Sequence, residues 1–87
     1  MAVHVVIYTT PYCPYCIGAK RLLTAKNVVF EEIDVSRDFA QRRIMEEKSK
    51  RRTVPQIWIG EQHIGGFDDL NALNQQGELD ALLKAAL

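Results

Sequence analysis

Several features that would point to common classes of protein are scarce or missing in this sequence. Its 87 residues include two cysteines, too few for the disulfide framework of a small secreted scaffold. The longest apolar run has four members, Val5 to Tyr8, whereas a membrane-spanning helix needs about 20. No basic segment precedes an apolar stretch near the first residue. We therefore expect no membrane span, no secretory leader and a cytoplasmic location.

An excess of charge of either sign is also missing. The chain has 11 basic and 11 acidic residues, so its formal net charge is zero. Proteins that bind nucleic acid or anionic membranes mainly by charge are strongly basic, and we expect neither kind of partner. With 47% apolar and 25% charged residues, the composition is typical of a folded globular protein. The length suits one domain, which we expect to span residues 1–87.

Periodicity and turn residues predict the order β-α-β-α-β-β-α. The strand–helix–strand start predicts a parallel pair with a right-handed crossover, and the later hairpin adds antiparallel strands. The sequence therefore predicts an α/β protein with a thioredoxin-like fold, in which helices flank a four-stranded mixed sheet. The expected strands are residues 3–8, 28–34, 56–59 and 62–64, and the expected helices are 14–26, 38–50 and 67–87 with a break at Gly77.

The two cysteines form the step Cys13-Pro14-Tyr15-Cys16 between the first strand and the first helix. Pro14 suits the first helical position, so Cys13 is expected to cap the helix with backbone N–H groups pointing toward its sulfur. The positive end of the helix dipole favours a thiolate at Cys13. Cys16 falls on the apolar stripe, where burial favours the neutral thiol. This asymmetry predicts an exposed nucleophile and a shielded resolving thiol for thiol–disulfide exchange.

Metal binding is the main alternative for the two cysteines. A structural zinc ion needs four ligands, and only His4 and His63 could supplement the thiols, without finger-like spacing. A c-type haem site needs histidine after the second cysteine, and that residue is Ile17. The strand-to-helix placement favours redox chemistry, so we predict no metal site. A pair of inert buried thiols stays open as a further interpretation.

A second motif, Thr53-Val54-Pro55, precedes the third predicted strand. A proline at a strand entrance loses no ladder donor and can adopt a cis bond. A cis bond would turn the N–H and C=O of Val54 outward, where an extended peptide could pair with them. A proline that simply starts a strand is the alternative.

Charge is distributed unevenly along the chain although the total is zero. Residues 37–52 hold seven basic and three acidic side chains, a net charge of +4, and residues 61–87 hold one basic and five acidic, a net charge of −4. Gly65-Gly66-Phe67-Asp68-Asp69 opens the last helical region, and its N–H groups can bind a carboxylate. A groove between the basic segment and the segment that starts at Gly65 would suit a small zwitterionic thiol. Solvated helix faces are the alternative explanation of such charge runs.

Together these motifs resemble those of a dithiol glutaredoxin of bacterial type. The resemblance rests on Cys13-Pro14-Tyr15-Cys16, Thr53-Val54-Pro55-Gln56 and Gly65-Gly66-Phe67-Asp68-Asp69-Leu70, and it covers nearly the whole chain. It implies Cys13 as the glutathionylated nucleophile, Cys16 as the resolving cysteine, a cis bond before Pro55, glutathione as the reducing co-substrate and no bound cofactor. The glutathione-binding residues that it implies are Tyr15, Arg42, Thr53, Val54, Pro55, Gly66, Phe67, Asp68 and Asp69.

One position departs from the family pattern. Many members have lysine three residues before the first cysteine, where this chain has Thr10. Threonine can donate a hydrogen bond but carries no charge, so we expect Arg42 or Arg51 to supply the charge near the glycine carboxylate of glutathione.

The sequence thus predicts a monomeric, glutathione-dependent thiol–disulfide oxidoreductase that acts on disulfide-containing and glutathionylated proteins. One alternative is an electron donor reduced by thioredoxin reductase. Another is an iron–sulfur or metal-binding module, which the resemblance disfavours because cluster-binding members usually lack a proline at the position of Pro14. A third is a catalytically silent interaction domain.

Overall fold

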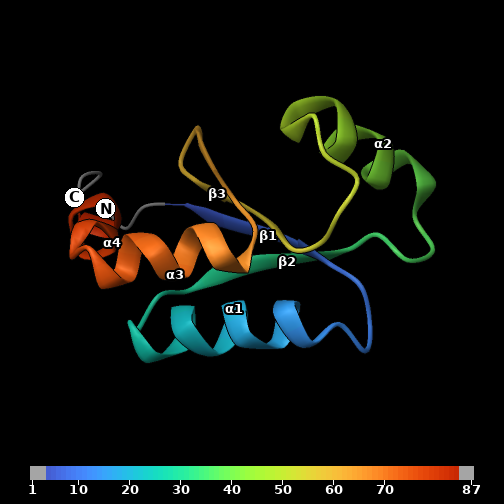
Figure 1. Ribbon diagram of the computed structural model, residues 1–87. Coiled ribbons are helices and arrows are strands. Elements are labelled where there is room, and N and C mark those ends of the chain that lie inside the picture. The colour runs from blue at the N-terminus through green and yellow to red at the C-terminus, as the bar shows by residue number, and fades with distance from the viewer. Residues whose placement is uncertain (1–3, 85–87) are drawn as a thin grey trace.

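Four strands form a mixed sheet in the computed structural model, which describes residues 4–84 (Figure 1). The central strand β1 pairs in parallel with β2 and antiparallel with β3, and β3 pairs antiparallel with the edge strand β4. This topology confirms the predicted thioredoxin-like fold. Val3 and residues 85–87, which we assigned to the first strand and the last helix, lie outside the described residues. The strands are β1 (Val5–Thr9), β2 (Phe30–Asp34), β3 (Gln56–Ile59) and β4 (Gln62–Gly65), in the spatial order β2-β1-β3-β4.

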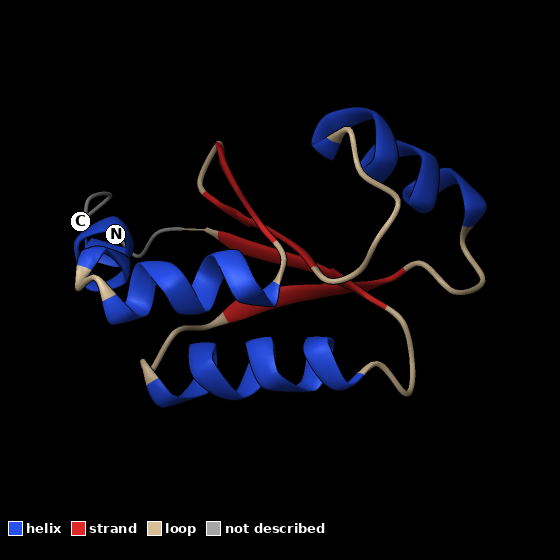
Figure 2. Ribbon diagram, viewed as in Figure 1, coloured by secondary structure: helices blue, strands red, loops and turns tan. Residues whose placement is uncertain are grey.

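Helices cover both faces of this sheet (Figure 2). The predicted interruption at Gly77 is confirmed, and its φ of +77° is a conformation that glycine adopts at little cost. Among residues 4–84, no helix combines the length and the apolar character needed to traverse a bilayer. The helices are α1 (Pro14–Ala25), α2 (Phe39–Ser49), α3 (Phe67–Gln75) and α4 (Glu78–Lys84).

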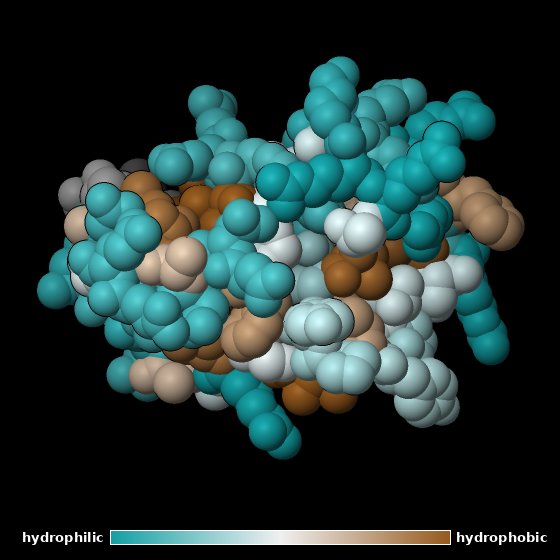
Figure 3. All heavy atoms as spheres, viewed as in Figure 1, coloured by the Kyte–Doolittle hydropathy of each residue, from teal (hydrophilic) through white to brown (hydrophobic). Residues whose placement is uncertain are grey.

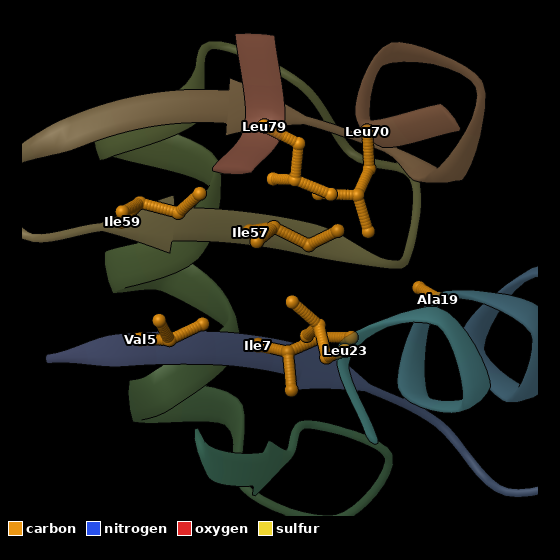
Figure 4. Packing of buried hydrophobic residues seen from close by; sticks show 8 residues of the cluster. All are labelled: Val5, Ile7, Ala19, Leu23, Ile57, Ile59, Leu70 and Leu79. Atoms are coloured by element: carbon orange, nitrogen blue, oxygen red, sulfur yellow. The ribbon is translucent and has the colours of Figure 1, made fainter. Parts of the chain in front are cut away.

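The larger hydrophobic core lies between the sheet and the helices α1, α3 and α4 (Figure 4). Side chains alternate along a strand, so residues two apart in β1 and in β3 share this face. The packing holds α1 and α3 side by side, and both helices begin at the same end of the sheet (Figure 1). The buried members of this core are Val5, Ile7, Ala19, Leu23, Ile57, Ile59, Leu70 and Leu79.

A close approach between α1 and α3 depends on Gly18. A Cβ atom at this position would lie 3.2 Å from Cζ of Phe67, so the ring occupies space that any larger residue would need. The contact places the first turn of α3 against α1 near its two cysteines.

A smaller core attaches α2 to the opposite face. Met45 is completely buried there with Tyr8, Val35 and Trp58. The rings of Tyr8 and Trp58 meet edge to face at 5.3 Å, and Nζ of Lys48 lies 4.8 Å from the centre of the Trp58 ring. With so few buried residues, the docking of α2 depends strongly on each of them.

We therefore expect Met45→Ala to lower the free energy of unfolding by about 2–5 kcal/mol, because it leaves a cavity under α2. The matched control on the same helix is Phe39→Ala. Phe39 is 80% exposed, so this change should stay within about 0.5 kcal/mol of the wild type. Urea denaturation followed by circular dichroism measures both. Equal effects of the two substitutions would show that Met45 does not anchor α2.

Candidate active site

The cap of α1 is the first component of the site. Cys13 adopts an extended conformation immediately before Pro14, and its sulfur accepts a hydrogen bond from the Cys16 N–H at 3.2 Å. Its side chain is partly exposed. The predicted placement is confirmed: the sulfur of Cys13 lies at the positive end of the helix, where backbone donors stabilise negative charge.

Cys16 lies one turn further along α1 and is 1% exposed. Burial raises the pKa of its thiol from 9.0 to about 12, and the hydrogen bond to Cys13 acts in the same direction, against the backbone of Thr10 and the charge of Lys20. Cys16 is therefore a neutral thiol at physiological pH. Both cysteines are free thiols in this structure.

The loop before β3 forms the wall that faces Cys13. The bond between Val54 and Pro55 is cis, as the resemblance implied. The sulfur of Cys13 lies 3.8 Å from the carbonyl oxygen of Val54. The backbone of Val54 therefore runs directly beside the nucleophile.

A cavity of about 270 Å³ opens between this loop and the first turn of α3. Eight of the nine residues that the resemblance implies for glutathione line it, and Arg42 is the exception. The lining residues are Tyr15, Arg51, Thr53, Val54, Pro55, Gly66, Phe67, Asp68 and Asp69.

An ion pair joins the two walls of the cavity. Nη1 of Arg51 donates to Oδ2 of Asp69 at 3.0 Å, and the same oxygen accepts from the Gly66 N–H at 2.9 Å. The backbone hydrogen bond from Gly66 and then the one from Arg51 lower the pKa of Asp69, which is ionised at neutral pH. The pair is about half exposed, so a charged ligand can compete for either partner.

Arg42 has a different position from the one expected. Its Nε donates to Oε2 of Glu46 at 3.1 Å, and its Nη2 donates to the carbonyl oxygen of Arg52 at 3.0 Å. The structure thus directs its guanidinium to the loop after α2, whereas Arg51 supplies the cation that lines the cavity. Thr10 is likewise not among the lining residues.

Gln56 directly follows Pro55, which lines the cavity, and it was not among the expected site residues. It is completely buried. Its Nε2 donates to the carbonyl oxygen and to Oγ1 of Thr53, at 3.0 and 3.2 Å. Its Oε1 lies 2.8 Å from Nε2 of His63, and because an amide oxygen only accepts, this histidine nitrogen carries the proton. A buried amide therefore holds the binding loop to the edge strand β4.

No cluster of three or more His, Cys, Asp or Glu side chains within the described range, residues 4–84, could hold a metal ion. The two cysteines support thiol–disulfide exchange. One thiol is placed for attack and a second, neutral thiol stands one turn away to resolve the mixed disulfide. These features define the protein as a thiol–disulfide oxidoreductase.

Comparison with known proteins identifies the family. The Glutaredoxin family model matches residues 5–64. A glutaredoxin of Pseudomonas aeruginosa is 57% identical over 81 residues, which make up 93% of this chain and 96% of that protein. The solution structure of a glutaredoxin from Brucella melitensis is 52% identical, with a TM-score of 0.86 over 99% of this chain and 94% of the other. The chain belongs to the glutaredoxin family.

A third solved structure is similar at lower sequence identity. The crystal structure of a buckwheat glutaredoxin–glutathione complex is 27% identical to this chain, with a TM-score of 0.88. The match covers 95% of this chain and 78% of that one. The backbone arrangement described above is therefore similar to one that has been seen in a complex with glutathione.

The raised pKa of Cys16 predicts a specific loss of stability in alkaline solution. The pKa of the Cys16 thiol is 9.0 in the unfolded state and about 12 in the folded state. The unfolded state therefore releases its proton first as the pH rises. The stability that the neutral thiol of Cys16 contributes is fully present below pH 9.0 and is lost as the pH approaches about 12. We expect Cys16→Ala to lose less stability than the wild type between pH 9 and 10.5, with slopes differing by up to about 1.4 kcal/mol per pH unit.

Urea titrations of the reduced proteins at several pH values measure this difference. Comparing slopes rather than absolute stabilities removes the cost of the small cavity left by alanine. Parallel slopes for the two proteins would contradict the raised pKa.

Proposed function

We propose that the protein is a glutathione-dependent oxidoreductase that reduces protein disulfides through both cysteines and glutathione mixed disulfides through Cys13 alone. The observation that carries this proposal is the cavity beside Cys13, about 270 Å³ in volume. One wall is the loop backbone with the cation Arg51, and the other wall carries the carboxylates of Asp68 and Asp69. Glutathione combines the same features, since it is an extended tripeptide with a thiol in the middle and a zwitterionic γ-glutamyl end.

The walls suggest how the tripeptide is held. Its cysteinyl residue pairs with the backbone of Val54 as an added strand, which brings its sulfur to Cys13. Arg51, which we expected near the glycine carboxylate, pairs with Asp69 in the first turn of α3, so in this proposal it binds the γ-glutamyl carboxylate together with the N–H groups of that turn. The ammonium group of the same end is bound by Asp68. In this proposal the opposite charges of Arg51 and Asp68, on the two walls of the cavity, match the opposite charges of one ligand terminus.

Reduction of a glutathionylated protein then takes two exchanges. The Cys13 thiolate attacks the glutathione sulfur, a new S–S bond forms, and the protein sulfur leaves with the electron pair as a thiolate. The thiolate of a second glutathione attacks the glutathione sulfur bound to Cys13. Oxidised glutathione is released, and the Cys13 thiolate is regenerated. Cys16 takes no part in this route.

A protein disulfide is reduced by a different second step. After Cys13 has formed the mixed disulfide, the Cys16 thiol loses its proton and attacks the sulfur of Cys13. The substrate leaves as a dithiol, and Cys13 and Cys16 are joined in a disulfide that glutathione reduces. Because the cavity is built from residues of a single chain, we propose that a monomer carries out both routes. Two free thiols suit the reducing environment of the cytoplasm, where we place the reaction.

The division of labour between the cysteines is tested with Cys16→Ser. Incubation with oxidised glutathione should give a stable adduct of one glutathione on Cys13, because no internal thiol can displace it. Mass spectrometry of the intact protein and of its peptides locates the adduct. The variant should keep its activity toward glutathione mixed disulfides and lose the reduction of protein disulfides. An adduct on no residue, or loss of both activities, would contradict the proposal.

The assignment of Arg51 is tested against Arg42 as a matched control. Arg51→Gln removes a charged partner of the γ-glutamyl carboxylate, worth about 1.5–3 kcal/mol, and should raise the KM for a glutathionylated peptide at least about 10-fold with little change in kcat. Arg42→Gln should leave this KM within about 2-fold. Steady-state kinetics of both variants decide between the two arginines. An equal rise of the KM for Arg42→Gln would show that Arg42 also binds glutathione.

The same assay separates the proposal from its nearest rival. A glutaredoxin-like electron donor for which thioredoxin reductase is the reductant would turn over with that enzyme and NADPH and not with glutathione. Turnover with glutathione and glutathione reductase supports the proposal.

A further inference from the structure

A second depression lies beside the active site, at the carboxyl end of α2. It has a volume of about 440 Å³ and is formed by α2 together with the loop that follows it. Hydrophilic side chains gather over this part of the molecule (Figure 3). We refer to this depression as the α2 groove, and its lining residues are Arg43, Glu46, Glu47, Lys50, Arg51 and Arg52.

The α2 groove carries an excess of positive charge. Four of its six lining residues are cations. One of its two carboxylates, Glu46, is already bound by Arg42 from outside the groove, with 3.1 Å between Nε and Oε2. Among the described residues, no ion pair engages Arg43, Lys50 or Arg52. The groove therefore has three cations without an ion-pair partner among the described residues, beside a single carboxylate, Glu47, that is likewise outside these ion pairs.

Two of these cations, Lys50 and Arg52, lie in the loop that follows α2, and side chains of α2 hold the backbone of this loop in place. Lys50 ends the helix in the left-handed conformation, with φ of 61°, and turns the chain back along α2. Oγ of Ser49 donates to the carbonyl oxygen of Arg51 at 3.1 Å and accepts from its N–H at 3.0 Å. Arg42 donates to the carbonyl oxygen of Arg52 at 3.0 Å. The loop backbone is thus ordered before any ligand binds, which lowers the entropic cost of binding.

The α2 groove adjoins the active-site cavity. Arg51 lines both the groove and the cavity beside Cys13. The chain runs from the groove through Arg52 and Thr53 to Val54, whose carbonyl oxygen lies 3.8 Å from the Cys13 sulfur. A polypeptide whose disulfide reaches Cys13 therefore has a neighbouring segment within reach of the groove.

We infer that the α2 groove binds an acidic segment of the protein substrate, with Asp or Glu residues within a few positions of the cysteine that Cys13 attacks. The inference rests on the proposed reduction of protein disulfides and adds a substrate class to it. Cations at the groove attract such a segment before the exchange and raise the association rate, because opposite charges steer encounter. Small disulfides that do not extend into the groove gain nothing from it.

The test uses the reduced wild-type protein in single turnover, so that it supplies both electrons. Cys13 and Cys16 become joined by a disulfide while one intramolecular disulfide of a synthetic peptide is reduced to two thiols. Two peptides share one sequence except that four flanking Asp and Glu residues in the first are Asn and Gln in the second. Acid quenching and chromatography give the rate constants at low and high salt.

We expect the acidic peptide to react about 10-fold faster than the neutral one at low salt, and this advantage to fall to about 2-fold at 0.5 M salt. The triple variant Arg43→Gln/Lys50→Gln/Arg52→Gln should lose the preference and keep the wild-type rate with the neutral peptide. The matched control Arg21→Gln/Arg37→Gln/Lys84→Gln removes the same charge from residues outside the groove and should keep the preference.

Three results would overturn the inference while leaving the proposed function intact, and the first two come from the rates. One is an equal rate for both peptides with the wild type, and the other is an equal loss of preference in the two triple variants. A single-stranded oligonucleotide that inhibits at lower concentration than a cysteine-free acidic peptide would also overturn it, because the groove would then favour phosphates. Failure to reduce either peptide would instead contradict the proposed function itself.

Discussion

One hydrogen bond, from the N–H of Cys16 to the sulfur of Cys13, links the fold to the chemistry. It exists because the short loop after β1 ends at a cysteine that is followed by a helix whose first residue is Pro14, so that Cys13 takes the capping position. The same turn that gives Cys13 a donor places Cys16 inside the core, where its thiol stays neutral. The unequal chemistry of two identical side chains thus follows from a single helix terminus.

The remainder of the structure holds two walls beside that terminus. The larger core packs α3 against α1, so that Asp68 and Asp69 face the cavity. On the other side of the sheet, the small core under α2 and the buried amide of Gln56 hold the loop that contains Val54. Neither wall is close to Cys13 in sequence, so the binding site depends on both cores being formed.

The order of the elements could be predicted because each is bounded by a strong local signal, such as Pro14 before α1 or Gly77 between α3 and α4. The first residue of β2 could not be predicted from the sequence. Val28 closes the end of α1 by donating to the carbonyl oxygen of Leu23 at 3.1 Å, so the strand starts at Phe30. The choice between Arg42 and Arg51 also lies beyond sequence patterns, because it depends on the left-handed turn at Lys50. The role of Gln56 depends on its tertiary contact with His63.

The separation of charge between α2 with its following loop and the segment containing α3 and α4 has a consequence for the whole molecule. Helix α2 packs on one face of the sheet and α3 and α4 pack on the other (Figure 2), with net charges of +4 on residues 37–52 and −4 on residues 61–87. A molecule with zero net charge and such a distribution has a large electric dipole moment. A charged partner therefore exerts a torque on it, and an acidic substrate turns the basic side of the molecule toward itself as it approaches.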